Sequence, residues 1–157
     1  MMNFDLPDEF REAATYLLTW NPDDWELTVE EYYARVLITV TAGGFMSGWT
    51  LGTNFRQMQP GDEVLVYRHG GFGGIVAHGF AVCEPYPGDA DGNEVDESSM
   101  EAWWVQVAWQ AWKPLEVRLR PEELAELAPE TFGGPIRASG HRVAAEEADA
   151  LRDAFYR

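Results

Sequence analysis

The residues best suited to binding another molecule lie within positions 49–83, WTLGTNFRQMQPGDEVLVYRHGGFGGIVAHGFAVC. Two β-prone runs, 63–68 and 75–83, flank a glycine-rich loop, a pattern that predicts a β-hairpin. Seven glycines lie between Trp49 and Gly79, which is more than a hairpin requires. Glycine permits tight turns and lets another molecule approach the backbone closely. We therefore expect a binding site in this stretch.

The aromatic residues in and near this stretch suggest a ligand with a planar ring. The candidate faces are Trp20, Trp49, Tyr67 and Phe72. Each of these rings taken singly is more commonly a core residue, but Trp20 and Trp49 both adjoin turn residues at the end of a run. Aromatic faces combined with glycine backbone and a few amide or hydroxyl groups suit a planar nucleobase.

Catalytic and metal sites find little support in the sequence. The histidines at 69, 78 and 141 lack the i, i+4 spacing of a helical zinc site, and the single cysteine, Cys83, is predicted to be a small buried residue. The sequences MSGW and ASGH do not match G-x-S-x-G, and HGGFGGIV lacks the lysine of a phosphate loop. DADGNEVDE lacks the glutamate that ends a calcium loop. We expect a binding protein without enzymatic activity, metal or cofactor.

The elements that must position these residues follow from periodicity and turn chemistry. The sequence predicts strands over 15–20, 63–68, 75–83, 102–112 and 115–119, and helices over 28–38, over 121–128 and after Ala144. Five to six strands with short flanking helices, curved by glycines, predict an α+β fold built on a small curved β-barrel. We expect one domain over 1–157, in which 1–14 form an acidic N-terminal extension.

The net charge of −16 would ordinarily argue against nucleic acid, because phosphates attract Lys and Arg. Residues 34–83 nevertheless carry three arginines against two acids, so the acidity surrounds the proposed site rather than running through it. One cysteine, no signal pattern and no long apolar run predict a soluble cytoplasmic protein without a membrane anchor.

Several sequence features occur together in an order that resembles a known family. They are TWNP, GWTLGTNFRQMQPGDEVLVYRHG, GGIVAHGFAV, a tryptophan-rich strand, and RASGHRV before the last helix. This order over residues 15–156 resembles the EVE domain of the PUA-like superfamily, which also includes the YTH and ASCH domains. It is most similar to the EVE-like domains attached to HNH endonucleases in modification-dependent restriction.

The resemblance implies a pocket that receives a modified base flipped from DNA, such as methylated or hydroxymethylated cytosine, or a modified nucleotide in RNA. Trp49 would stack on the base, while backbone groups near Gly52 and Gly74 and the Ser139 hydroxyl would read its edge. The implied pocket consists of Trp20, Asn21, Pro22, Trp49, Thr50, Gly52, Arg68, Gly74, Ile75, Ser139 and Gly140.

Two departures from the family pattern bear on this expectation. No HNH module is present in the sequence, so cleavage would require a separately encoded nuclease. The acidity favours a small modified nucleotide, a short single strand or a partner-assisted complex over a long duplex. The available phosphate contacts are Arg56, Arg68, Arg137 and Arg142, and four contacts on a duplex predict a salt slope of about −3.6.

Two other functions are compatible with the same fold. One is a small-molecule sensor or protein-interaction module that does not bind nucleic acid, which the acidic charge favours. The other is a hydrolase of the ASCH type acting on a modified nucleoside. That hydrolase would need a lysine and a carboxylate in the pocket, whereas the sole lysine, Lys113, lies outside the matching segments.

Overall fold

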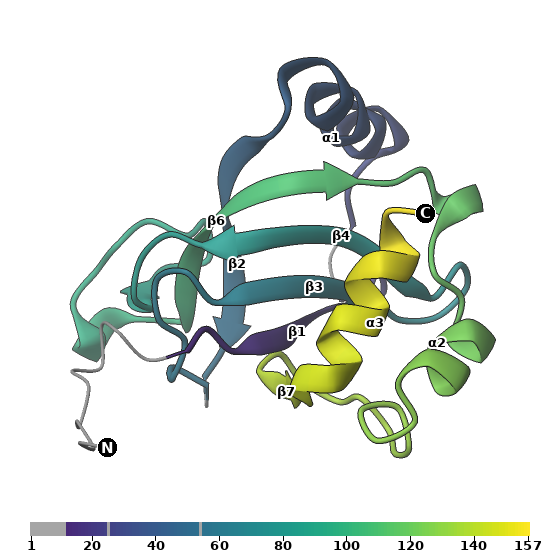
Figure 1. Ribbon diagram of the computed structural model, residues 1–157. Coiled ribbons are helices and arrows are strands. Elements are labelled where there is room, and N and C mark those ends of the chain that lie inside the picture. The colour runs from purple at the N-terminus through teal and green to yellow at the C-terminus, as the bar shows by residue number, and fades with distance from the viewer. Residues whose placement is uncertain (1–11, 25, 54) are drawn as a thin grey trace, which may run out of the picture.

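The computed structural model describes residues 12–24, 26–53 and 55–157. Its centre is a mixed seven-stranded sheet in the order β2-β6-β4-β3-β1-β7, with β5 paired to β6. The elements in chain order are β1 (Thr15–Trp20), α1 (Val29–Ala42), β2 (Phe45–Gly52), β3 (Glu63–Arg68), β4 (Gly74–Ala81), β5 (Tyr86–Gly88), β6 (Ala102–Trp112), α2 (Pro121–Leu127), β7 (His141–Val143) and α3 (Ala145–Phe155). Figure 1 shows α3 lying across one face of the sheet with α2 near it, while α1 lies beyond β6.

The predicted hairpin is confirmed and forms the middle of the sheet. β3 and β4 pair antiparallel from Glu63 opposite Phe80 to Arg68 opposite Gly74. On its other edge, β3 pairs with β1, and this pair is parallel, with Thr15 opposite Glu63 and Trp20 opposite Arg68. The carboxyl ends of β1 and β3 therefore meet at the same edge of the sheet.

The sequence Gly61-Asp62 aligns the starts of these two strands. Gly61 has a φ of 90°, a conformation that glycine adopts without strain. The buried Asp62 carboxylate accepts hydrogen bonds from the backbone N–H of Ala14 at 3.0 Å and of Gln59 at 2.9 Å. Because a buried carboxylate needs such donors, Asp62 fixes the turn before β3 and the entry to β1 together.

The expected closed barrel is wrong, although the α+β class is correct. Among the described residues, the ladders end at β2 on one side and at β7 on the other, so the sheet is open. The strand expected over 115–119 is also wrong, since Leu115–Val117 form a 3-10 turn and only Leu119 bridges to Ile75. β6 occupies that edge of β4 as far as Ala77, which leaves little of β4 free for a further strand.

The predicted helices agree with the structure better than the predicted barrel and the strand over 115–119 do. α1 begins with the expected capping box, in which Thr28 accepts from the Glu31 N–H, and it ends at Gly43 with a left-handed φ of 80°. α2 and α3 begin near the expected positions. The acidic extension expected over 1–14 falls mostly on residues 1–11, outside the described part of the chain. No helix of the described residues has the length and apolar character to cross a bilayer.

Both faces of the sheet are covered by apolar residues. On the face toward α1, the rings of Trp20, Trp49, Trp109 and Trp112 are at most 2% exposed and pack together. Strict alternation in β6 would place Trp109 and Trp112 on opposite faces, but a register shift against His78 and Gly79 turns both inward. On the other face, α2 and α3 pack on a second cluster that includes Leu17, Leu65, Ile75, Leu124, Leu151 and Phe155.

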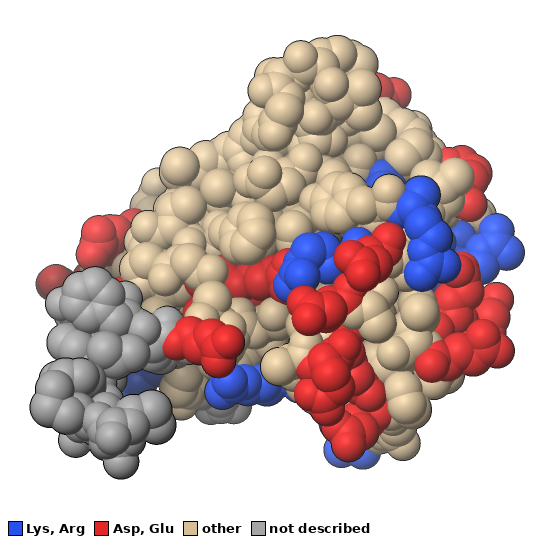
Figure 2. Space-filling view, in the orientation of Figure 1, with Lys and Arg blue, Asp and Glu red and all other residues tan. Residues whose placement is uncertain are grey.

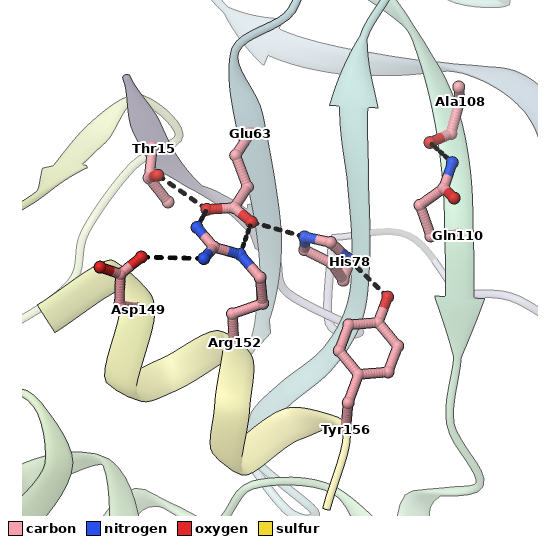
Figure 3. A network of polar contacts seen from close by, with 8 residues as sticks. All are labelled: Thr15, Glu63, His78, Ala108, Gln110, Asp149, Arg152 and Tyr156. Atoms are coloured by element: carbon pink, nitrogen blue, oxygen red, sulfur yellow. Dashed lines mark hydrogen bonds and ion pairs between the residues drawn. The ribbon is translucent and has the colours of Figure 1, made fainter. Parts of the chain in front are cut away.

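A buried polar network holds α3 against the sheet (Figure 3). The Glu63 carboxylate accepts hydrogen bonds from Thr15 at 2.8 Å and from Arg152 at 2.5 and 2.7 Å. Its Oε2 also lies 2.7 Å from His78 Nε2, whose ring contacts the Tyr156 hydroxyl through Nδ1 at 2.6 Å. Burial raises the pKa of Tyr156 to about 12, so its hydroxyl stays protonated. Glu63 thus joins β1, β3, β4 and α3.

The Glu63 network predicts acid-sensitive stability. Burial alone would raise the Glu63 pKa, but hydrogen bonds from Arg152, His78 and Thr15 outweigh burial and lower it from 4.5 to about 2. A carboxylate with a lowered pKa stabilises the fold by about 3 kcal/mol at neutral pH. This contribution is complete above about pH 4.5 and is lost as the pH falls toward 2. Urea unfolding of wild type and Glu63→Gln between pH 7 and pH 2 measures it.

Glu63→Gln should destabilise the protein by about 3 kcal/mol at pH 7. Its free energy of unfolding should also fall much less between pH 7 and pH 2 than that of wild type. Asp149→Asn is the matched control. Asp149 contacts the same Arg152 at 2.9 Å, but its side chain is 74% exposed, so its loss should cost less than about 1 kcal/mol. Equal costs for the two variants, or identical pH profiles for Glu63→Gln and wild type, would contradict the assignment.

Candidate functional site

A polar cleft of about 520 Å³ opens where β1 and β2 end. Four segments that are distant in sequence contribute to it: the end of β1 and the following turn, the end of β2, the start of the β3–β4 loop, and the segment before β7. The lining residues are Thr19, Asn21, Asp24, Thr50, Leu51, Gly52, His69, Arg137, Ala138 and Ser139.

Local hydrogen bonds shape the two strand ends in the cleft. Asn21 follows β1 and accepts the Asp23 N–H through its side chain and the Asp24 N–H through its carbonyl, both at 3.0 Å. This Asx turn reverses the chain after Trp20. At the end of β2, Gly52 has a φ of 78°, and its N–H lies 3.3 Å from Thr50 Oγ1. Both strands therefore stop in tight turns that face the cleft.

Ser139 joins the segment before β7 to β1. Its Oγ accepts the Thr19 N–H at 2.9 Å and lies 3.3 Å from Thr19 Oγ1. The next residue, Gly140, donates its N–H to the Leu17 carbonyl at 2.9 Å. The Phe55 ring lies where a Cβ on Gly140 would be, only 2.3 Å away, so this position requires glycine. The two hydroxyls of Thr19 and Ser139 consequently lie side by side in the cleft.

Glu147 on α3 anchors the loop that leads to Ser139. Its buried carboxylate accepts the N–H groups of Glu130 and Thr131 at 2.9 and 2.8 Å, and the Thr131 hydroxyl at 2.6 Å. Burial opposes ionisation, but these hydrogen bonds lower the Glu147 pKa below its usual value. Glu147 remains ionised at neutral pH and fixes the loop on the second apolar cluster.

The charges at the cleft are few and mixed. Burial lowers the pKa of His69 more than Asp24 raises it, so the imidazole is neutral near pH 7. The backbone N–H of His69 donates to the Trp20 carbonyl at 2.8 Å, and the imidazole ring packs edge-on against Tyr67 at 5.0 Å. Arg137 is the cation of the lining and Asp24 is its acid. The cleft therefore offers a neutral planar ring, a guanidinium, a carboxylate and hydroxyl groups.

Five of the sequence-predicted residues come together in this cleft: Asn21, Thr50, Gly52, Ser139 and, from the expected phosphate contacts, Arg137. Pro22 is half-buried next to Asn21 and does not line the cleft. The sequence interpretation missed Thr19, Asp24, Leu51 and Ala138 and gave no role to His69. His69 could be recognised only from the parallel pairing of β1 with β3, which brings it to the end of β1.

Trp49 and Trp20, which were expected to present faces to a base, are buried in the apolar cluster and do not line the cleft. Trp49 is 2% exposed and packs 5.7 Å from Trp109, while Trp20 is 1% exposed and stacks 6.0 Å from Tyr32. The Trp49 Nε1–H also donates to the Thr19 carbonyl at 3.4 Å. Truncating such a ring costs about 3–5 kcal/mol. The lining residues of the cleft are instead mainly polar, and neither indole is among them.

Arg68, Gly74, Ile75 and Gly140 were also expected to line the pocket, and they serve the fold instead. Arg68 is 9% exposed, lies over the Trp20 ring at 5.0 Å and donates to the Gly71 carbonyl. A Cβ on Gly74 would lie 2.0 Å from the Leu119 carbonyl. The backbone at Gly74 is therefore approached closely by the Leu119 backbone and not by a ligand. Ile75 is fully buried in the second cluster.

The remaining expected phosphate contacts do not line the cleft. Arg56 lies over the Trp103 ring at 5.3 Å and 3.5 Å from Glu97. Arg142 lines a different cavity, together with Asp149 and Arg152 of α3. Among the described residues, Arg137 is thus the one member of this set at the cleft. The salt slope of binding expected above assumed four arginine–phosphate contacts, and only one of these arginines lines the cleft.

A second cavity, of about 490 Å³, lies beside β2 and shares Thr50 with the cleft. Its lining includes Trp104, Trp49 and Arg35, together with the acidic residues Asp89 and Glu101. The Asp89 carboxylate is already occupied by the N–H groups of Asp91 and Asn93. Within the described residues, no group of three or more His, Cys, Asp or Glu side chains is placed to hold a metal ion.

The open mixed α+β sheet, with helices on both faces and a cleft at the strand ends, is the architecture of a PUA-like domain. Residues 45–154 match the EVE domain family, and the chain belongs to that family. The match is to the EVE family as a whole and does not test the expected likeness to the HNH-associated subgroup. Among curated proteins, none matches the chain by sequence.

Solved structures show the same fold at low sequence identity. Rpa0253 from Rhodopseudomonas palustris is 18% identical, with a TM-score of 0.50 over 92% of this chain and 94% of that one. Two variants of ZmASCH from Zymomonas mobilis are each 10% identical, with TM-scores of 0.51 and 0.50, and each covers 89% of this chain. The matches cover 97% and 95% of the two ZmASCH chains.

The Glu147 anchor predicts that the cleft loosens when this carboxylate is altered. Glu147→Gln places an amide against backbone donors and should destabilise the protein by about 1–3 kcal/mol. Hydrogen exchange measured by mass spectrometry should become faster over residues 130–140. Glu146→Gln, at the exposed neighbouring position, is the control and should change little. Unchanged protection of 130–140 in Glu147→Gln would show that the loop is held by other contacts.

Proposed function

We propose that the chain is a non-enzymatic module that binds a modified nucleotide of DNA or RNA in the cleft between the ends of β1 and β2. Membership of the EVE family supports it, because the PUA-like fold suggests nucleic-acid binding. The observation that carries the proposal is the convergence of Asn21, Thr50, Gly52, Arg137 and Ser139 on one cavity of about 520 Å³. That volume is in the range of small-molecule sites.

The groups at the cleft match the edges and faces of a base. The neutral His69 ring and the Arg137 guanidinium are planar groups on which a base can stack. The Asp24 carboxylate can accept a hydrogen bond from an exocyclic amine such as that of cytosine. Leu51 and Ala138 supply apolar contacts for a methyl group. These features favour methylated or hydroxymethylated cytosine among the candidate modifications.

The hydroxyl pair explains how a polar edge could be read. Thr19 Oγ1 and Ser139 Oγ are 3.3 Å apart, and either can donate to the other. Each hydroxyl has one proton, and the contact between them uses the proton of whichever hydroxyl donates. The other hydroxyl can therefore donate its own proton to an acceptor on a ligand. The Thr19 N–H already satisfies one lone pair of Ser139. The pair thus offers one donor to the carbonyl or hydroxyl oxygen of a nucleotide.

The charge distribution favours a flipped or single-stranded nucleotide. Arg137 is accompanied by Asp24 in the cleft, and the net charge of −16 repels a long phosphate backbone. A few phosphate contacts suffice for a short strand. Any cleavage of modified DNA would then fall to a separately encoded nuclease, in keeping with a role in modification-dependent restriction.

A hydrolase is less well supported than a binding module. Asp24, His69 and Ser139 do line the same cleft, as an acid, a base and a nucleophile would. The hydrogen bonds found for Ser139 Oγ, however, lead to Thr19 rather than to His69, whereas an activated serine needs a base within hydrogen-bond reach. Lys113, the lysine that an ASCH-type reaction would require, lies over the Phe155 ring at 4.7 Å.

A second candidate function, self-association, is favoured by the outer surface of α1. Val29, Tyr33, Leu37 and Val40 form one stripe of this helix and are 71%, 37%, 61% and 76% exposed. Figure 2 shows that the surface around α1 and β6 is almost free of charged residues, which gather near α3. Two copies of so acidic a chain can approach closely only through an uncharged face.

The proposed binding is tested with a panel of oligonucleotides. Fluorescence anisotropy with labelled strands containing cytosine, 5-methylcytosine, 5-hydroxymethylcytosine or N6-methyladenine should show preferential binding of a modified strand. Arg137→Ala and Ser139→Ala should each weaken it about 10-fold, since each removes one cleft contact worth about 1–2 kcal/mol. The salt slope should be shallow, about −0.7 to −1.4, as expected for one or two phosphates of a single strand.

Arg142→Ala is the control for this panel, because Arg142 lies at a different cavity. It should bind within about twofold of wild type, since it removes an equal charge without touching the cleft. Equal binding of modified and unmodified strands, or loss of affinity in Arg142→Ala equal to that in Arg137→Ala, would contradict the proposed site.

Self-association is tested by sedimentation velocity. The wild type should form a dimer at high protein concentration, and Leu37→Glu should remain monomeric because it places a charge in the stripe. Val82→Glu is the matched control, since Val82 is 40% exposed and directly follows β4 rather than belonging to α1. A wild type that stays monomeric throughout the concentration series would rule out this role of α1.

A further inference from the structure

The loop between β3 and β4 holds an exposed aromatic residue in a strained conformation. Phe72 has a φ of 57° and is the one non-glycine residue with positive φ in the described chain. Its side chain is 57% exposed. A left-handed conformation costs a bulky residue roughly 1–2 kcal/mol, and Gly70, Gly71, Gly73 and Gly74 surround it. The fold would be served at least as well by another glycine at this position.

This glycine-rich loop is held in place by two arginines. Arg68 donates to the Gly71 carbonyl. Arg118 donates through Nε to the Gly73 carbonyl at 2.7 Å and through Nη1 to the Leu115 carbonyl at 2.9 Å. A Cβ on Gly73 would lie 2.9 Å from the Gly70 carbonyl, so the loop is tightly closed. Phe72 is therefore presented by a fixed loop rather than by a loose one.

The Phe72 ring is largely exposed, and Arg118 lies over it. The Arg118 guanidinium lies over the ring at 5.2 Å from its centroid, an arrangement that fixes the ring orientation through a cation–π contact. No other ring contact of Phe72 is found among the described residues. A buried core role is excluded by its exposure. Strain at an exposed and well-held aromatic residue is typical of a ligand contact.

The loop begins at His69, which lines the cleft. We propose that Phe72 stacks on the base adjacent to the nucleotide held in the cleft. This inference rests on the proposed function and adds a second subsite for a neighbouring base. Stacking on an aromatic ring requires no phosphate contact, so it lets a chain of net charge −16 gain affinity for a single strand where cations are scarce.

The test compares a single nucleotide with a short strand. The probes are 5-hydroxymethyl-dCMP and the same residue flanked by two thymidines on each side, titrated by calorimetry. Stacking on one base contributes about 1–3 kcal/mol, so Phe72→Ala should weaken pentanucleotide binding about 5- to 150-fold. Binding of the monophosphate should change less than twofold. A 2-aminopurine beside the modified base should be quenched by wild type and not by Phe72→Ala.

Two further variants separate stacking from folding. Phe72→Gly relieves the strained φ and should raise the melting temperature or leave it unchanged, while it weakens pentanucleotide binding as Phe72→Ala does. Phe80→Ala is the matched control, because Phe80 is 36% exposed on β4, outside the loop. Phe80→Ala should bind both probes within twofold of wild type.

The outcomes distinguish this inference from the function on which it rests. Wild-type pentanucleotide affinity in Phe72→Ala overturns the stacking role and leaves the cleft proposal intact. An equal loss for both probes also overturns it, because Phe72 would then contact the nucleotide in the cleft. If wild type binds neither probe nor any strand of the oligonucleotide panel, the proposed function itself fails and the second subsite falls with it.

Discussion

The parallel pairing of β1 with β3 is the constraint on which the rest of the structure depends. Asp62 fixes the two strand starts by holding the Ala14 and Gln59 N–H groups. Glu63, one residue further, binds Thr15 of β1 and Arg152 of α3. Because the strands run parallel, their other ends, Trp20 and Arg68, also meet. The same pairing therefore builds the acid-sensitive support at one edge and the polar cleft at the other.

The division between core and cleft follows from the size and chemistry of the side chains. Indole rings bury large apolar areas, and the open sheet needs them on its α1 face, where they form one cluster. The cleft above this cluster is lined by short polar side chains such as Thr19 and Ser139, whose hydrogen bonds to each other and to backbone fix the strand ends. The buried indoles and the polar lining are thus separate, and Trp49 connects them through its hydrogen bond to the Thr19 carbonyl.

Arginine is used in this acidic chain chiefly to hold the fold together. Arg68 and Arg118 fix the β3–β4 loop through backbone carbonyls, and Arg152 joins α3 to Glu63. Few cations remain to meet a phosphate backbone, and Arg137 is accompanied by Asp24 at the cleft. This distribution makes shape, hydrogen bonding and stacking the main sources of any affinity. The proposed nucleotide binding is therefore compatible with the net acidity.

The sequence by itself determined the local elements, because capping, turn chemistry and periodicity act over a few residues: the Thr28 capping box, the β3–β4 hairpin and the extent of β6. The family resemblance also pointed to Asn21, Thr50, Gly52 and Ser139, which the structure brings together in one cleft. Only the tertiary structure decided that Trp20 and Trp49 are buried, that a register shift turns Trp112 inward and that the sheet stays open. Burial and strand order depend on contacts between residues far apart in the chain, and residue types and spacing do not specify those contacts.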